Sequence, residues 1–129
     1  MKIIHPEGWP RPKGYSNAIL TEGRMIFVAG QVGWNQNEKF ESLDFVDQTR
    51  QALSNILTIL RQAGAGAEHI VRMTWFVADA NEYNDRLKEV GQVYRDVIGS
   101  HYPAMSMLQV AGFVENGACV EIETTAVIP

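Results

Sequence analysis

The sequence has few of the features that mark secreted, membrane-spanning or disulfide-rich proteins. Its 129 residues include one cysteine, Cys119, so no disulfide can form within the chain. No apolar run approaches the roughly 20 residues needed to cross a bilayer, and residues 1–6 lack the apolar stretch of a signal peptide. We therefore expect a cytoplasmic protein with no membrane partner.

Positive charge is also scarce, and it is not concentrated anywhere along the chain. Eleven lysines and arginines stand against 15 acidic residues, which gives a net charge of −4. A nucleic-acid-binding face needs a concentrated set of basic side chains to neutralise phosphates. The histidines, His5, His69 and His101, show no metal-ligand spacing. We therefore predict no nucleic-acid partner, no metal and no cofactor.

The remaining composition is that of an ordinary globular protein. Hydrophobic residues make up 46% of the chain and charged residues 20%. The length fits one domain over residues 1–129. A chain of this size buries only about two-thirds of its unfolded surface, so association with further copies would add burial.

Three strands are predicted before the first helix, at residues 2–4, 16–20 and 24–32. The third is strongly apolar. Thr21-Glu22-Gly23 is typical of a turn, so the second and third strands are predicted to form a hairpin.

Hydrophobic periodicity predicts two helices on either side of an alternating strand at residues 70–77. The first helix covers residues 44–63, with Asp44 as N-cap, Gly64 just past its end and Gln48 on its solvated face. The second covers residues 81–98, with Asp79 as N-cap and Gly99 at its end.

Two final strands, at residues 104–110 and 118–128, complete a βββαβαββ order, in which the helices can cover only one face of a sheet. Asn116-Gly117 predicts a turn between them. Alternation places Glu121 away from the helices, and we expect Met105 and Met107 on that same uncovered face. An apolar face interrupted by a carboxylate predicts a surface that other subunits cover, and hence a homo-oligomer.

Several motifs, in order and over nearly the whole chain, resemble the YjgF/RidA family, also called L-PSP endoribonuclease-like. The matching segments are Gly14-Tyr15-Ser16-Asn17-Ala18, Val28-Ala29-Gly30-Gln31, Gln48-Thr49-Arg50-Gln51-Ala52-Leu53-Ser54-Asn55, Tyr102-Pro103-Ala104 and Val120-Glu121-Ile122-Glu123.

This resemblance implies a chorismate-mutase-like α/β (α+β) fold, with a mixed sheet and two helices on one face. It implies a homotrimer around a central barrel, with a cleft between each pair of neighbouring subunits. Members of the RidA group hydrolyse reactive enamines and imines, such as 2-aminoacrylate and its imine tautomer, to a keto acid and ammonia. The resemblance therefore implies a small-molecule metabolite as the partner.

The family's functional positions can be placed on this sequence one by one. The glutamate that directs water corresponds to Glu121, a pocket tyrosine to Tyr15, and the backbone contacts to Ala29 and Gly30. Met105 stands where the family has its carboxylate-binding arginine. Met107 stands at a position that is commonly cysteine, and Gly91 at one that is often asparagine.

The methionine at 105 matters because arginine offers a rigid fork of donors to a carboxylate, whereas a thioether offers none. Met105 and Met107 fit simple packing at a subunit contact or the lining for a bulkier ligand. Trp34 and Phe113 could extend such a lining. Glu121 fits either a group that positions water or acts as a general base, or an interfacial carboxylate paired with Arg72, Arg24 or a backbone amide.

The sequence leads to one favoured function and two alternatives. The favoured one is a hydrolase or deaminase of an imine, enamine or related reactive metabolite at inter-subunit clefts, with specificity altered by Met105. The first alternative is a trimer that binds a small metabolite without chemistry. The second, a ribonuclease, is disfavoured by the acidic charge balance and the lack of paired histidines.

Overall fold

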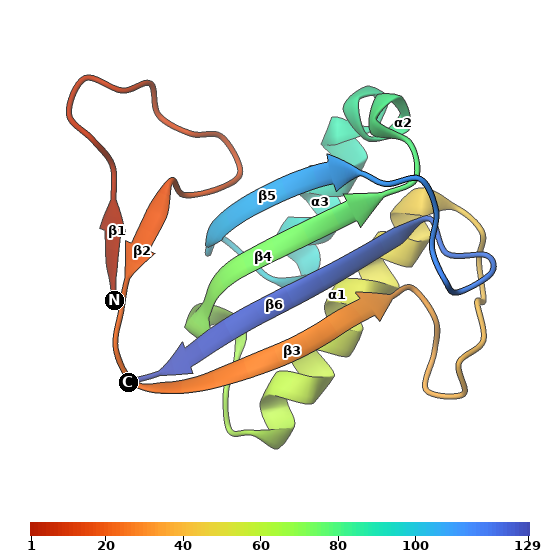
Figure 1. Ribbon diagram of the computed structural model, residues 1–129, viewed down its shortest axis with the longest axis horizontal. Coiled ribbons are helices and arrows are strands. Elements are labelled where there is room, and N and C mark those ends of the chain that lie inside the picture. Colours follow the sequence, from red (N-terminus) through yellow and green to blue (C-terminus); the bar gives the residue numbers. More distant parts are fainter.

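The computed structural model describes residues 1–129 and places one mixed β-sheet against a layer of helices (Figure 1). The predicted βββαβαββ order is confirmed, with the second helix divided in two. The elements are β1 (Lys2–Ile4), β2 (Ala18–Leu20), β3 (Arg24–Val32), α1 (Phe45–Gln62), a short 3-10 turn (Ala67–His69), β4 (Ile70–Val77), α2 (Ala80–Asp85), α3 (Leu87–Val97), β5 (Ala104–Gln109) and β6 (Val120–Ile128).

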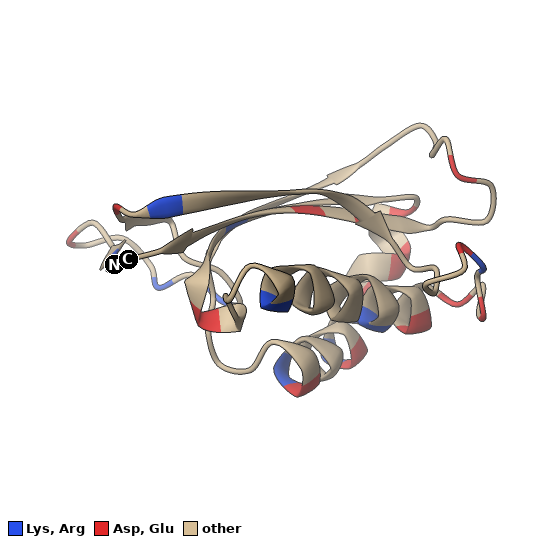
Figure 2. Ribbon diagram, turned by 90° about the horizontal axis from the view of Figure 1, so that it is seen from below, with Lys and Arg blue, Asp and Glu red and all other residues tan.

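The main sheet has four strands in the order β3-β6-β4-β5. The last strand of the chain, β6, lies in the middle of the sheet and runs antiparallel to both of its neighbours. Strands β4 and β5 are parallel, so the chain crosses over between them through α2 and α3. Helices therefore cover one face of the sheet, and the other face is left open (Figures 1 and 2).

The predicted hairpin of the second and third strands is wrong. Strand β2 pairs antiparallel with β1 in a separate two-stranded sheet, which Figure 1 shows standing apart from β3. The chain does bend at Gly23, whose φ of 141° suits glycine. A turn signal identifies where the chain bends, but it does not determine which strand becomes the partner.

Helix α1 begins and ends where the sequence predicts. The Asp44 carboxylate accepts hydrogen bonds from the amides of Val46 and Asp47, each at 3.1 Å, and so caps the first turn. Gly64 follows the last turn with φ 77°. The apolar stripe packs on the sheet, with Leu53, Ile56 and Leu60 fully buried in the main core.

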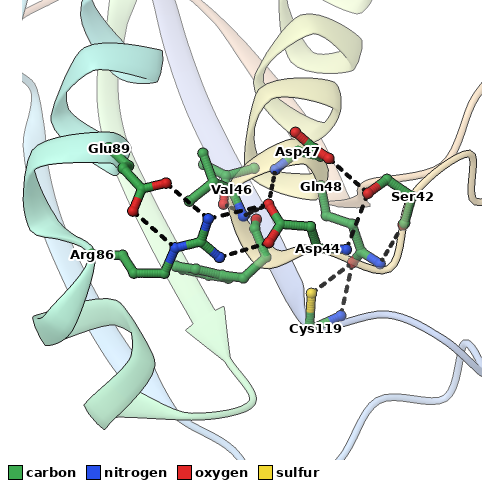
Figure 3. Close-up of polar contacts among 10 residues, drawn as sticks. Ser42, Asp44, Val46, Asp47, Gln48, Arg86, Glu89 and Cys119 are labelled. Atoms are coloured by element: carbon green, nitrogen blue, oxygen red, sulfur yellow. Dashed lines mark hydrogen bonds and ion pairs between the residues drawn. The ribbon is translucent and has the colours of Figure 1, made fainter.

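The second predicted helix is broken at Arg86, whose backbone (φ −115°, ψ 27°) is not helical. The Arg86 guanidinium bonds to Asp44 Oδ1 at 2.6 Å and to Glu89 Oε2 at 2.8 Å (Figure 3). Arg86 therefore joins the start of α1 to the junction of α2 and α3. As predicted, Asp79 caps α2, and Gly99 follows α3 with φ 97°.

Gln48, predicted to be on the solvated side of α1, is 1% exposed. Its amide nitrogen donates to the carbonyls of Ser42 (3.0 Å) and Gly117 (2.8 Å), and its amide oxygen accepts from the Cys119 amide at 2.9 Å (Figure 3). Gln48 thus ties the start of α1 to the turn before β6. The hydrogen bonds compensate for burying a polar side chain.

Most of the charged residues coloured in Figure 2 lie on the helices and loops, and a few lie on the strands. None of the helices is long and apolar enough to cross a membrane.

Candidate functional site

The Glu121 carboxylate lies directly against the backbone of Gly30. Strand β3 has a register shift relative to β6 between Val28 and Gln31, and Gly30 lies within it. A Cβ added to Gly30 would lie 2.5 Å from Glu121 Oε2, so only glycine leaves room for the carboxylate in its present position. Glycine at a strand irregularity typically marks such a close approach.

Glu121 lies half-buried on the sheet face opposite the helices. It lines a hollow of about 220 Å³, whose walls include Phe76, Phe113 and Val114. Glu121 forms no ion pair and no side-chain hydrogen bond, so neither Arg72 nor Arg24 pairs with it. Its oxygens are consequently available to accept hydrogen bonds from water or a ligand.

Met105 and Met107 lie on the other face of the sheet, so their expected grouping with Glu121 is wrong. In the parallel β4–β5 pair, Met105 is in register with Met73 and Met107 with Trp75. Met73 and Trp75 are buried beneath the helices, and both β5 methionines pack against that core. Alternation shows which residues share a face, whereas the pairing register decides which face it is.

A cavity of about 270 Å³ lies between these methionines and the α2–α3 segment. It brings together Gly91, Met105 and Met107, the three positions at which the sequence resemblance led us to expect a departure from the family pattern. The remaining lining residues are Lys13, Gly14, Trp75, Tyr83, Leu87, Val90, Tyr94, Arg95 and Tyr102. The sequence analysis missed Lys13, Trp75 and Arg95, although the spacing of four between Gly91 and Arg95 would have indicated that they share a helix face.

Two tyrosines of this cavity, Tyr83 and Tyr94, are partly or largely buried, and burial disfavours their ionised forms. Burial, with a smaller contribution from Tyr102, raises the pKa of Tyr94 far above its ordinary value, and burial also raises that of Tyr83. The Tyr94 hydroxyl donates to the His101 carbonyl at 2.6 Å, and its ring stacks on Tyr102 with centroids 5.3 Å apart. The cavity wall is therefore aromatic and uncharged on this side.

Tyr15 and Ala29 lie apart from Glu121 and from each other. The neighbouring Ser16 fixes the Tyr15 segment, because its amide and hydroxyl donate to the Pro103 and Tyr102 carbonyls. Tyr15 is 42% exposed and lines a separate hollow. Ala29 lines a shallow depression on the open sheet face. Within one chain the predicted site residues therefore fall into two separate groups, Gly30 with Glu121 and Met105 with Met107.

The contacts of Cys119 and Trp34 indicate packing roles for both residues. The Cys119 thiol lies 3.0 Å from Gln48 Oε1, and burial raises its pKa to about 11, which makes it a poor nucleophile. Trp34 packs against Phe40, with ring centroids 5.8 Å apart. No group of three or more histidine, cysteine or acidic residues is placed to hold a metal ion.

Comparison with known proteins places this chain among established relatives. The family model described as endoribonuclease L-PSP matches residues 10–128. The chain belongs to the YjgF/RidA family. Among its relatives, a 2-iminobutanoate/2-iminopropanoate deaminase of Homo sapiens is 32% identical over 88% of this chain and 79% of its own length. A protein of the same name from Bos taurus is 34% identical over 98% and 89%.

Solved structures of YjgF/RidA proteins confirm the fold. A Rid-family protein of unknown function from Yersinia pestis, named YyfB, superposes with a TM-score of 0.86 at 31% identity and covers 98% of both chains. The E. coli protein TdcF, solved with bound serine, superposes with a TM-score of 0.72 at 30% identity over the full length of both chains. The α+β architecture with a mixed sheet is therefore that of the family.

Proposed function

We propose that this protein hydrolyses an imine, or the enamine in equilibrium with it, to a carbonyl compound and ammonia. The observation that carries this proposal is the unpaired Glu121 carboxylate held against the Gly30 backbone. Relatives of 32–35% identity, named 2-iminobutanoate/2-iminopropanoate deaminases, support the reaction class.

The chemistry needs one base that can also return a proton. Glu121 accepts a proton from water while the water oxygen bonds to the imine carbon and the C=N pair moves to nitrogen. The protonated carboxyl returns that proton to the nitrogen, which gives a carbinolamine. Glu121 then transfers the hydroxyl proton of the carbinolamine to the amine, and the C–N bond breaks as the carbonyl forms and ammonia leaves. Water and imine are thereby converted to carbonyl compound and ammonia with Glu121 regenerated.

Substrate choice depends on Met105, which stands at the family's arginine position and lies under α3. Methionine supplies no charged donor, and a charge-assisted hydrogen bond contributes about 1.5–3 kcal/mol. We propose that short 2-imino acids are therefore poor substrates. The same residue favours the alternative that the protein binds a metabolite without turnover.

The site is completed by a second copy, in a homotrimer with clefts between subunits. Glu121 and the methionine-lined cavity lie on opposite faces of the sheet, so one chain does not present both to a small molecule. The open face also carries Phe27, 74% exposed, and Leu108, 49% exposed, which a neighbouring subunit would cover. A monomer in light scattering would contradict this assembly.

The test of the reaction is hydrolysis of freshly generated 2-iminopropanoate and larger 2-imino acids in competition with semicarbazide. We expect Glu121→Gln to abolish turnover and Met105→Arg to improve turnover of the smallest substrate. If Glu121→Gln leaves every hydrolytic rate unchanged, the proposed chemistry is wrong. Specific binding of a ligand that is recovered intact would favour the binding protein instead.

Mixed assemblies test whether two copies share one site. Glu121→Gln removes the carboxylate from one face of the sheet, and Gly91→Trp fills the cavity on the other face. If each cleft combines the two faces from different copies, co-refolding the two variants restores about one cleft in four. If the mixture is as inactive as each variant alone, no cleft combines Glu121 of one copy with the cavity of another.

A further inference from the structure

The cavity under α3 combines an apolar floor with cations and has no acid to balance them. Met105, Met107 and Trp75 supply apolar surface, while Lys13 and Arg95 contribute positive charge. No aspartate or glutamate is among its lining residues. A cavity of about 270 Å³ lies near the lower end of ligand-site sizes, about 300 Å³, so its occupant is small.

Arg95 occupies the space that the absent side chain at Gly91 leaves open. The two residues are one turn apart on α3, and long helical side chains lean back over the preceding turn. A Cβ added to Gly91 would lie 3.3 Å from Arg95 Nη1, so the guanidinium lies directly above the glycine. Gly91 thus admits a guanidinium to a cavity whose family arginine has been replaced by Met105.

The Arg95 guanidinium is not engaged by a carboxylate of the chain. Its one side-chain hydrogen bond is a long contact of 3.4 Å to Gln92 Oε1. An arginine in this state retains the paired donors that match a carboxylate. Arg95 is therefore able to bind an anion without first breaking an internal ion pair.

The wall of the same cavity also includes a buried tryptophan with an unpaired polar atom. Trp75, 2% exposed, is one of its lining residues, and its buried Nε1–H has no hydrogen-bond partner. Buried donors are nearly always paired, and an unpaired one is unfavourable.

We propose that this cavity binds small carboxylic acids with an apolar or aromatic body, and that Arg95 is their carboxylate anchor, with Lys13 adding positive charge. The apolar body packs on Met105 and Met107. The inference rests on the proposed function in one respect, because it names the substrate class of that reaction as small imino acids that carry an apolar or aromatic side chain. The binding itself requires no turnover.

Calorimetry with stable acids tests the anchor directly. The probes are 3-phenylpropionate, its uncharged amide and propionate, titrated into wild type, Arg95→Gln and Lys13→Gln. Arg61→Gln is the matched control, because Arg61 is an arginine near the end of another helix, α1, and outside the cavity. We expect 3-phenylpropionate to bind best, Arg95→Gln to weaken it about tenfold, and Arg61→Gln to leave it unchanged.

Two results would overturn the proposal, and neither depends on catalysis. The anchor is wrong if Arg95→Gln, with its thermal transition unchanged, binds 3-phenylpropionate as tightly as wild type. The ligand class is wrong if the amide or propionate binds as well as the acid. The two proposals fail separately: if wild type binds 3-phenylpropionate through Arg95 but hydrolyses no 2-imino acid, the reaction is wrong and the anchor stands.

Discussion

Replacing Gly30 by alanine should disable hydrolysis without unfolding the protein. The new Cβ would lie 2.5 Å from Glu121 Oε2 and 2.8 Å from its Cδ, whereas ordinary contacts begin at 3.4 Å. The carboxylate must therefore retreat by about 1 Å, and a misplacement of that size at a reacting group reduces rates about a hundredfold. The φ of Gly30 is not in the left-handed region, so alanine adds no backbone strain there.

Stability should change little, by less than about 1 kcal/mol, because the half-buried Glu121 side chain can rotate away from the new methyl group. The assay is the rate at which the protein lowers semicarbazone formation from a freshly generated 2-imino acid. Thermal denaturation of the same samples reports folding.

Gly66→Ala is the matched control for this variant. It places a Cβ 2.6 Å from Oε2 of another glutamate, Glu68, at the start of the 3-10 turn and outside the site. We expect Gly66→Ala to retain wild-type turnover. If Gly30→Ala also retains wild-type turnover, the position of Glu121 against Gly30 has no catalytic importance. If both variants lose activity, the loss is due to misfolding.

Three further predictions concern the network in Figure 3. Gln48→Leu leaves two carbonyls and one amide without partners, which should lower the free energy of unfolding by about 2–4 kcal/mol in urea titrations. Asp44→Ala removes the α1 cap at a cost of about 1 kcal/mol at pH 7. Arg86 holds the pKa of Asp44 below 3.8, so the difference from wild type should persist down to that pH and vanish as the pH falls through the lowered value. Cys119, with a pKa of about 11, should be alkylated about a hundredfold more slowly than an ordinary thiol at pH 8 until urea exposes it.

The sequence predicted the elements that local physical chemistry determines. The bounds of β3, β4 and α1 and the caps at Asp44, Asp79 and Gly64 all follow from periodicity and capping preferences. These features depend on residues a few positions apart, so an isolated sequence contains the information.

The misses all depend on contacts between distant residues. The 81–98 segment has no proline, and its one glycine, Gly91, lies within α3. The interruption falls instead at Arg86, which is held by Asp44 from 42 positions earlier. Gln48 looks solvated on a helical wheel, but it is buried because the Ser42 and Gly117 carbonyls need donors. Polar side chains that satisfy loop backbone groups cannot be distinguished from exposed ones by helical spacing alone.

The candidate site illustrates the same limit and explains what the assembly has to do. Alternation correctly separated Glu121 from Ile122, but the face occupied by Met105 depends on its pairing with Met73. That pairing puts the carboxylate on one side of the sheet and the cation-lined cavity on the other. A substrate that touches both within one chain would have to pass around a sheet edge. If the proposed function holds, a second copy of the chain has to bring its cavity to Glu121 of the first copy. Oligomerisation is then a requirement of catalysis as well as a source of stability.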